Sequence, residues 1–197
     1  MTSEHTKKYF YAVKEYPDDI IITFDDDFIY RDFIVATLYK SYIAHPDCVS
    51  AMRVHKMVFT QDGSPIPYNS WESECRNAEG IESHLWFATG VGGVLYPPHC
   101  LSGEVFNLEA LRKLSFMNDD VWLKFMEVMK GTKVVPAYET GKVQGRQIYG
   151  SQDFALWKTN VTGGENDVQI QAVLEHYSGW RDEKGRTLLE VIREDQA

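Results

Sequence analysis

Apolar positions along the chain alternate between helical and strand-like spacing. A helix is predicted over residues 4–16, and Pro17 ends its pattern. The run Ile20–Phe24 is apolar and β-branched, which fits a fully buried strand of a mixed or parallel sheet. A helix over residues 33–44 and a strand over residues 48–54 follow. This order of strand, acidic turn, helix and strand predicts an α/β fold.

Shorter elements are predicted for the rest of the chain. Asp62-Gly63 fits a hairpin turn, and the polar segment 69–83 is predicted to be a loop. Glycines interrupt an apolar stretch over residues 85–96. The later elements are helices over residues 107–114, 118–129 and 167–177, a strand over residues 133–136 and a surface loop over residues 137–165. No repeat or linker divides the chain, so a single domain over residues 1–197 is predicted, with residues 178–197 as its C-terminal tail.

Composition excludes several classes of protein. The chain has 197 residues, enough for one domain core, and its 44% hydrophobic and 25% charged residues fit a globular protein. A net charge of −9 without a Lys/Arg-rich block predicts no nucleic-acid partner. Cys48, Cys75 and Cys100 fit neither a disulfide framework nor a metal motif. No apolar run fits a signal peptide or a transmembrane segment, so we expect a cytoplasmic protein.

Three consecutive aspartates, Asp25, Asp26 and Asp27, directly follow the first predicted strand. Adjacent carboxylates repel one another, and a divalent cation relieves this repulsion because Mg²⁺ and Mn²⁺ prefer oxygen ligands. The carboxyl ends of strands are also where open α/β sheets bind their ligands. The pattern therefore predicts a metal site, and a solvated acidic turn is the alternative.

A second acidic pair, Asp119-Asp120, opens the predicted helix over residues 118–129. The helix dipole and the free N–H groups of the first turn stabilise carboxylates at this place. Capping by Asn118 or Asp119 explains one such residue but does not require two. The remaining carboxylate is therefore a candidate for chemistry.

Several sequence blocks together resemble the nucleotide-sugar glycosyltransferases of the GT-A fold, particularly bacterial family-2-like members. The blocks are Ile20–Tyr30, Thr89–Pro98, Asn118–Lys124 and, more weakly, Asn166–Ile170. The resemblance implies a GT-A-like mixed sheet flanked by helices. It also implies metal-dependent transfer of a sugar from a nucleotide-sugar donor to a carbohydrate acceptor, with inversion at the sugar.

The same resemblance implies roles for individual residues. Asp25 and Asp27 would hold Mn²⁺ or Mg²⁺ on the donor diphosphate, and Asp25 would also approach the ribose. The pair Gly92-Gly93 would lie beside the donor sugar, where the missing side chains let the backbone approach; a glycine-kinked strand is the alternative. Asp120 would be the base that deprotonates the acceptor hydroxyl, and Asp119 would contact or orient the acceptor.

The chain departs from this family at its amino-terminal end. Only 24 residues precede Asp25, whereas the family places far more chain there to hold the base and the ribose. We therefore expect the fold to lack part of the nucleotide-binding half, so that the chain is a fragment or nucleotide recognition is supplied elsewhere. We also expect the sheet edge left open in this way to be covered by self-association into a homo-oligomer, with the first helix helping to shield it.

Two other functions remain open on the sequence. A catalytically inactive glycosyltransferase remnant would bind carbohydrate or a partner chain without a metal. A metal-dependent phosphatase of the haloacid-dehalogenase type also carries an apolar strand followed by DxD. In this chain, however, Phe28–Tyr30 stands where that family has small residues and Gly-Thr.

Overall fold

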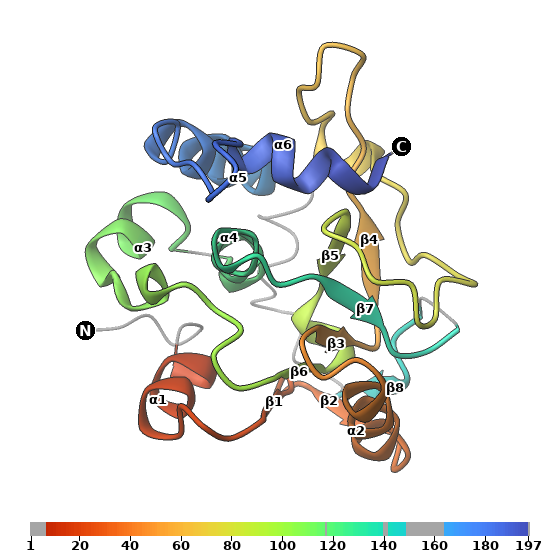
Figure 1. The fold of residues 1–197 in the computed structure, drawn as a ribbon. Helices are drawn as coiled ribbons and strands as arrows, with labels where there is room; N and C mark the ends of the chain where they lie inside the picture. Colours follow the sequence, from red (N-terminus) through yellow and green to blue (C-terminus); the bar gives the residue numbers. More distant parts are fainter. Residues whose placement is uncertain (1–6, 117, 140–141, 149–163, 197) are drawn as a thin grey trace.

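Helices and short strands alternate along the chain and form a mixed α/β fold (Figure 1). The computed structural model describes residues 7–116, 118–139, 142–148 and 164–196. The helices are α1 (Lys7–Glu15), α2 (Ile34–Ala44), α3 (Leu108–Leu114), α4 (Asp119–Lys130), α5 (Glu165–His176) and α6 (Leu188–Arg193). The strands are β1 (Ile21–Thr23), β2 (Phe28–Tyr30), β3 (Val49–Ala51), β4 (Val54–Lys56), β5 (Trp86–Ala88), β6 (Val94–Tyr96), β7 (Val134–Pro136) and β8 (Gly145–Gln147). Short 3₁₀ helices are η1 (Tyr68–Ser70), η2 (Gly90–Gly92), η3 (Gly103–Phe106) and η6 (Glu194–Gln196).

The central sheet has the strand order β1-β6-β3-β7. β6 is antiparallel to both β1 and β3, and β3 is parallel to β7. β1, β3 and β7 therefore run in one direction, and their carboxyl ends meet the start of β6 at one end of the sheet. Two small antiparallel pairs, β2 with β8 and β4 with β5, accompany this sheet.

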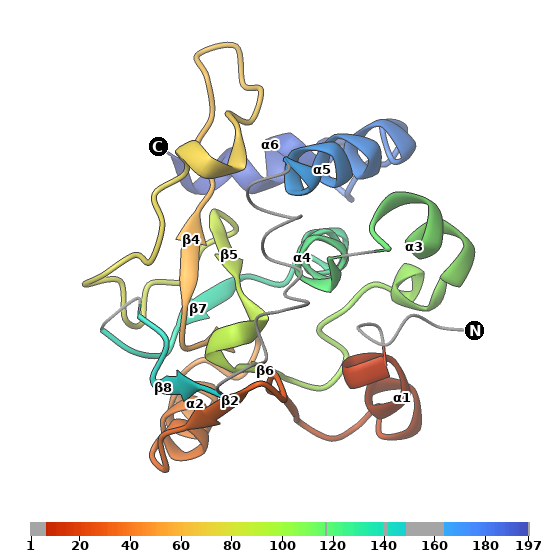
Figure 2. The same cartoon turned by 180° about the vertical axis from the view of Figure 1, so that it is seen from behind.

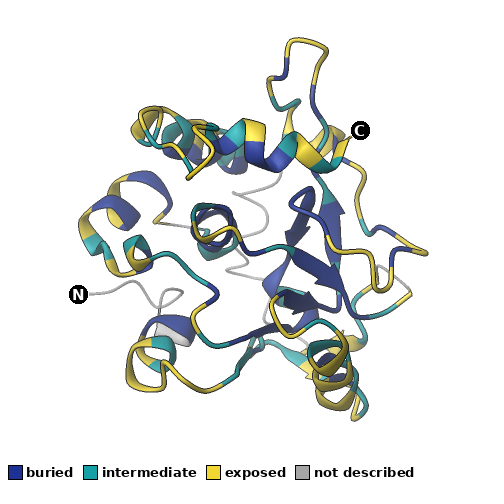
Figure 3. Cartoon of the chain, in the orientation of Figure 1, coloured by how far each residue is buried: buried dark blue, intermediate teal, exposed yellow. Residues whose placement is uncertain are grey.

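Helices pack on the two faces of the sheet, as the opposite views of Figures 1 and 2 show. Leu95 of β6 lies in the cluster beneath α2, whereas its neighbour Val94 lies in the larger core that contains α4. This alternation follows from the pleat, which points successive side chains to opposite faces. Figure 3 shows the buried strands at the centre and the exposed residues on the outer helices. No helix in the described part of the chain is long and apolar enough to cross a membrane.

The strand after residue 20 is not fully buried, contrary to the prediction from its apolar run. β1 lies at the edge of the sheet with β6 as its neighbour, and Ile21 and Ile22 are half-buried. A β-branched sequence favours an extended, pleated backbone but does not specify how deep in the sheet the strand lies. Within the described residues, β1 pairs only along one side.

Two further segments differ from the predicted elements. Residues 48–54 form not one strand but the whole of β3, a bend and the first residue of β4. The predicted loop over residues 137–165 contains β8, which pairs with β2, and the remainder of that loop over residues 149–163 lies outside the described residues. The hairpin turn at Asp62-Gly63 is confirmed, because the N–H of Thr60 donates to the carbonyl of Ser64 at 2.9 Å.

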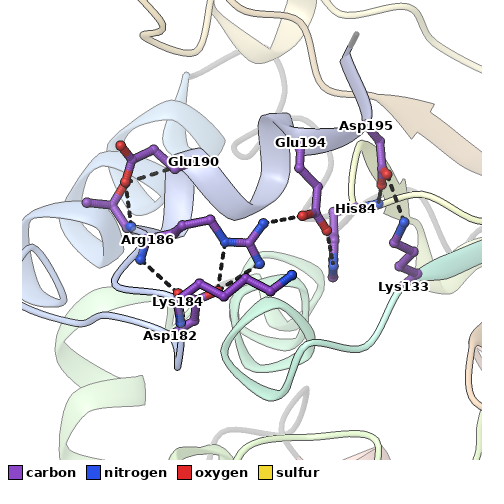
Figure 4. Close-up of polar contacts among 9 residues, drawn as sticks. His84, Lys133, Asp182, Lys184, Arg186, Glu190, Glu194 and Asp195 are labelled. Carbon is purple, nitrogen blue, oxygen red and sulfur yellow. Dashed lines mark hydrogen bonds and ion pairs between the residues drawn. The ribbon is translucent and has the colours of Figure 1, made fainter.

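Residues 178–196, within the predicted C-terminal tail, carry a helix that packs into the core. The side chains of Leu188, Val191 and Ile192 on α6 are buried. Figure 4 shows how the end of the chain is held: the carboxylate of Asp195 accepts hydrogen bonds from Lys133 Nζ at 2.7 Å and from the backbone N–H of His84 at 2.8 Å. These contacts make the segment part of the folded domain.

Self-association stays a prediction, and the exposed apolar face of α2 offers a test. Val35, Tyr39 and Ile43 are one helical turn apart, and Ile43 is 62% exposed. If this apolar stripe is covered by a second copy, Ile43→Lys should shift the protein toward monomer in sedimentation velocity at micromolar concentration. Val168→Lys on α5 is the control, because Val168 is also 62% exposed. A wild-type protein that sediments as a monomer contradicts the prediction.

Candidate functional site

The acidic turn, a glycine-containing turn and an arginine meet at the carboxyl ends of two parallel strands. Asp25–Asp27 follow β1, and Arg53 follows β3. η2 immediately precedes β6, which runs antiparallel to both strands, so it lies at the same end of the sheet. Open α/β sheets bind ligands at this position. We call the group of Asp25, Asp27, Arg53, η2 and Asp120 the strand-end site.

Asp120 reaches this site from α4. Its Oδ1 atom accepts a hydrogen bond from the backbone N–H of Gly90 at 3.1 Å. Asn118 is the cap of α4, since its side-chain oxygen accepts from the N–H of Asp120 at 3.0 Å. Neither aspartate is therefore needed as the cap, and the carboxylate of Asp120 is directed at η2 instead.

The acidic turn is joined to η2 through Tyr30. The Tyr30 hydroxyl donates to the carbonyl of Val91 at 2.9 Å and accepts from the N–H of Asp25 at 3.2 Å. Three blocks that are far apart in the sequence thus meet around η2. The structure brings Asp25 and Asp120 to one end of the sheet, connected through the backbone of this turn.

Two of the three aspartates are half-buried, and Asp26 between them is exposed. The carboxylate of Asp27 accepts a hydrogen bond from the side-chain amide of Gln147 on β8 at 3.2 Å. Among the described residues, no group of three or more His, Cys, Asp and Glu side chains is arranged to hold a metal. Two carboxylates nevertheless fit Mg²⁺ or Mn²⁺, because such ions keep several waters and take further ligands from substrate phosphates.

Gly92 and Gly93 allow the backbone around η2 to pack closely on its neighbours. A Cβ atom on Gly92 would lie 2.7 Å from the Cβ atom of Arg53. A Cβ atom on Gly93 would lie 2.7 Å from the ring of Phe24, and its φ of +92° is also one that favours glycine. The packing of this chain therefore accounts for both glycines without a ligand.

Asp119 lies half-buried in the first turn of α4. Burial raises the pKa of Tyr96 on β6, and the nearby charges of Glu127, Asp120 and Asp119 raise it further. The negative charges of Asp119 and Asp120 therefore influence the phenol of Tyr96, which lies on the strand that follows η2. Asp120 also accepts the hydrogen bond from the N–H of Gly90 in η2.

Arg53 and Tyr68 also belong to this region, and the sequence did not single them out. Arg53 Nη1 donates to Thr89 Oγ1 at 3.3 Å, next to η2. Burial raises the pKa of the Tyr68 phenol, and the charge of Asp120 raises it further. Arg53 lies inside the strand predicted over residues 48–54, so the sequence pattern does not identify it as a strand-end residue. The structure ends β3 at Ala51, and Arg53 follows that end.

The start of α5 is attached to the start of α4 by buried polar side chains. Asn118 Nδ2 donates to Asn166 Oδ1 at 2.6 Å, and Asn166 is buried. Asp167 Oδ1 accepts from the backbone N–H of Tyr68 at 2.7 Å. The weakest of the family-like blocks, Asn166–Ile170, therefore lies next to the block that contains Asp120.

His55 orders the loop beside Arg53 and provides a pH test. Its Nδ1 atom accepts from the N–H of Glu74 at 2.9 Å. Burial lowers the pKa of His55 from 6.5 to about 4, and the charge of Arg53 lowers it further. The unfolded chain therefore binds the proton first, so the free energy of unfolding decreases as the pH falls from 6.5 toward 4.

We expect His55→Asn to reduce this loss of stability, because asparagine keeps an acceptor near the Nδ1 position and does not titrate. Urea unfolding at about pH 7 and about pH 4.5 measures the difference. His99→Asn, at an exposed histidine, is the control and should behave as the wild type does. An equal loss of stability in wild type and His55→Asn contradicts the assignment.

A comparison with protein-family models, with curated proteins and with solved structures finds no match for this chain. Fold and site together define an α/β protein with two half-buried carboxylates, an arginine and a further carboxylate around one turn at the end of its sheet. Its chemistry must be inferred from these groups.

Proposed function

We propose that the chain is a GT-A-like glycosyltransferase domain that transfers a sugar from a nucleotide-sugar donor to a carbohydrate acceptor, with inversion. The observation that carries the proposal is the link at η2, where the N–H of Gly90 binds Asp120 and the carbonyl of Val91 binds Tyr30, the partner of Asp25. The reaction needs a group that holds the donor diphosphate and a base for the acceptor. The two acidic blocks, both connected to this turn, supply these groups.

In this proposal Asp120 takes the proton from the acceptor hydroxyl. A carboxylate accepts several hydrogen bonds at once, so its bond from Gly90 fixes the side chain and still allows an acceptor hydroxyl to bind. The acceptor oxygen forms a bond to the anomeric carbon as the bond to the diphosphate breaks on the opposite side, which inverts the configuration. Asp119 contacts or orients the acceptor.

Asp25 and Asp27 are the residues that would hold Mn²⁺ or Mg²⁺. When bound, the ion supplies positive charge that stabilises the departing nucleoside diphosphate. Asp25 also contacts the ribose, and the backbone of Gly92 and Gly93 lies along the donor sugar. These roles follow from the family resemblance and the place of the residues at the strand end.

Calorimetric titration with UDP, GDP and their sugars, with and without Mn²⁺, tests the proposal. Wild-type protein should bind one of these donors only with Mn²⁺, and Asp27→Asn should lose this binding because it removes a charged oxygen ligand. Asp47→Asn, at an exposed aspartate, is the control. Binding of carbohydrate without a metal would favour a non-catalytic binding module, and phosphate release from simple esters would favour a phosphatase.

A further inference from the structure

Arg53 is the cationic side chain of the strand-end site. It follows β3 by two residues, just as Asp25 follows β1, and β1 and β3 are parallel because both are antiparallel to β6. The carboxyl ends of the two strands therefore present a pair of carboxylates and one guanidinium at the same end of the sheet. Their arrangement places a positive charge across β6 from the carboxylates proposed to hold a metal.

The guanidinium of Arg53 is only loosely bound by the protein. Nη1 donates to Thr89 Oγ1 at 3.3 Å, and Nη2 lies 3.5 Å from Glu74 Oε1. The Nε atom is buried and has no hydrogen-bond partner among the described residues. Buried donors are nearly always paired, so an unpaired guanidinium N–H requires an explanation. The side chain is still 20% exposed, so a rotation of the guanidinium would let Nε and an Nη atom bind an oxyanion together, because the planar group matches phosphate oxygens with two parallel hydrogen bonds.

Glu74, the protein's own anion at Arg53, sits on a constrained loop. Its φ is +51°, in the left-handed region that residues other than glycine rarely adopt. The N–H of Glu74 donates to His55 Nδ1, which holds the backbone in place. The side chain of Glu74 is 38% exposed, compared with 20% for Arg53. A partly solvated carboxylate at 3.5 Å is a partner that a more highly charged anion can replace.

We infer that Arg53 binds the diphosphate group of the nucleotide donor at η2, and that Glu74 is the carboxylate that this group displaces. The inference rests on the proposed glycosyltransferase function for the identity of the anion. A nucleoside diphosphate gains negative charge as it leaves the sugar, and one divalent ion does not neutralise it fully. A guanidinium beside η2 therefore binds the departing diphosphate more tightly than the intact donor, which lowers the barrier to transfer.

Titration calorimetry with inorganic pyrophosphate and with UDP, each with and without Mn²⁺, tests the inference. Arg53→Met should weaken pyrophosphate binding by about tenfold or more, because a charge-assisted hydrogen bond is lost. Arg53→Lys should recover only part of the affinity, since a lysine lacks the planar fork. Glu74→Gln should strengthen binding by removing the competing charge. Arg181→Met, which removes the same charge from an exposed arginine, is the matched control and should bind as wild type does.

The outcomes separate this inference from the proposed function. If the Arg53 variants remain folded by circular dichroism and bind pyrophosphate as wild type does, the inference is wrong, and Mn²⁺-dependent donor binding can still support the glycosyltransferase. If binding of pyrophosphate depends on Arg53 but no nucleotide sugar binds, the anion site stands and the proposed function falls. If wild type binds neither probe, both fail. If Glu74→Gln binds pyrophosphate more weakly than wild type does, Glu74 is not the carboxylate that the anion displaces from Arg53.

Discussion

Asp120→Asn is expected to lower the rate of sugar transfer by about 10²- to 10⁴-fold, the usual contribution of a general base. The substitution removes the proton acceptor and keeps the shape of the side chain. Its amide oxygen can still accept the hydrogen bond from the N–H of Gly90 that holds η2. Single-turnover transfer from the nucleotide sugar measures the rate, and calorimetry measures donor binding, which should be unchanged.

Asp119→Asn is the matched control for this prediction. It carries the same chemical change one residue earlier on α4. We expect it to raise the KM for the acceptor more than it lowers kcat, because a residue that orients the acceptor contributes to binding. Equal rates in Asp120→Asn and wild type would remove Asp120 as the base.

Trp122→Ala is expected to destabilise the protein by about 3–5 kcal/mol, the usual cost of removing a buried aromatic side chain. Trp122 has no exposed surface, and its Nε1–H donates to the carbonyl of Val105 at 3.3 Å, so the substitution leaves a cavity and an unpaired carbonyl. For a chain of this size the melting temperature should fall by roughly ten degrees or more. Differential scanning calorimetry provides the measurement.

The same substitution distinguishes a core tryptophan from one that stacks on a sugar. The complete burial of Trp122 places it in the core and leaves no face of its ring for a sugar. Trp122→Phe should restore most of the stability because a phenyl ring refills much of the volume. A loss of carbohydrate binding in Trp122→Ala without a loss of stability would contradict the assignment to the core.

The boundaries of several helices could be predicted because their signals are local. Pro17 marks the end of the first helix, Asn118 provides the cap of α4, and Gly131 ends α4 with a φ of +80°. Each signal acts through the backbone of the same turn, either by removing a donor, by pairing a free N–H or by adopting the left-handed region. Such effects do not depend on the rest of the fold.

The depth of an element in the molecule could not be predicted in the same way. A helical period predicts one buried face, yet every residue of α4 from Val121 to Val128 is buried. Lys124 donates from Nζ to the carbonyl of Trp86 at 2.8 Å, and burial lowers its pKa to about 8. Burial raises the pKa of Glu127 to about 7. These polar residues are buried because α4 lies between β5 and the helices α5 and α6, an arrangement that no helical period encodes.

The sequence alone shows which segments carry carboxylates suited to metal binding or proton transfer: the aspartates after the first strand, and the pair at the start of α4. That these segments meet follows from the strand order, because the antiparallel β6 places η2 between the ends of β1 and β3. Arg53 could be recognised as a residue of this site only from the structure, in which β3 ends at Ala51. Strand order depends on contacts between residues far apart in the chain, and local propensity carries no information about them.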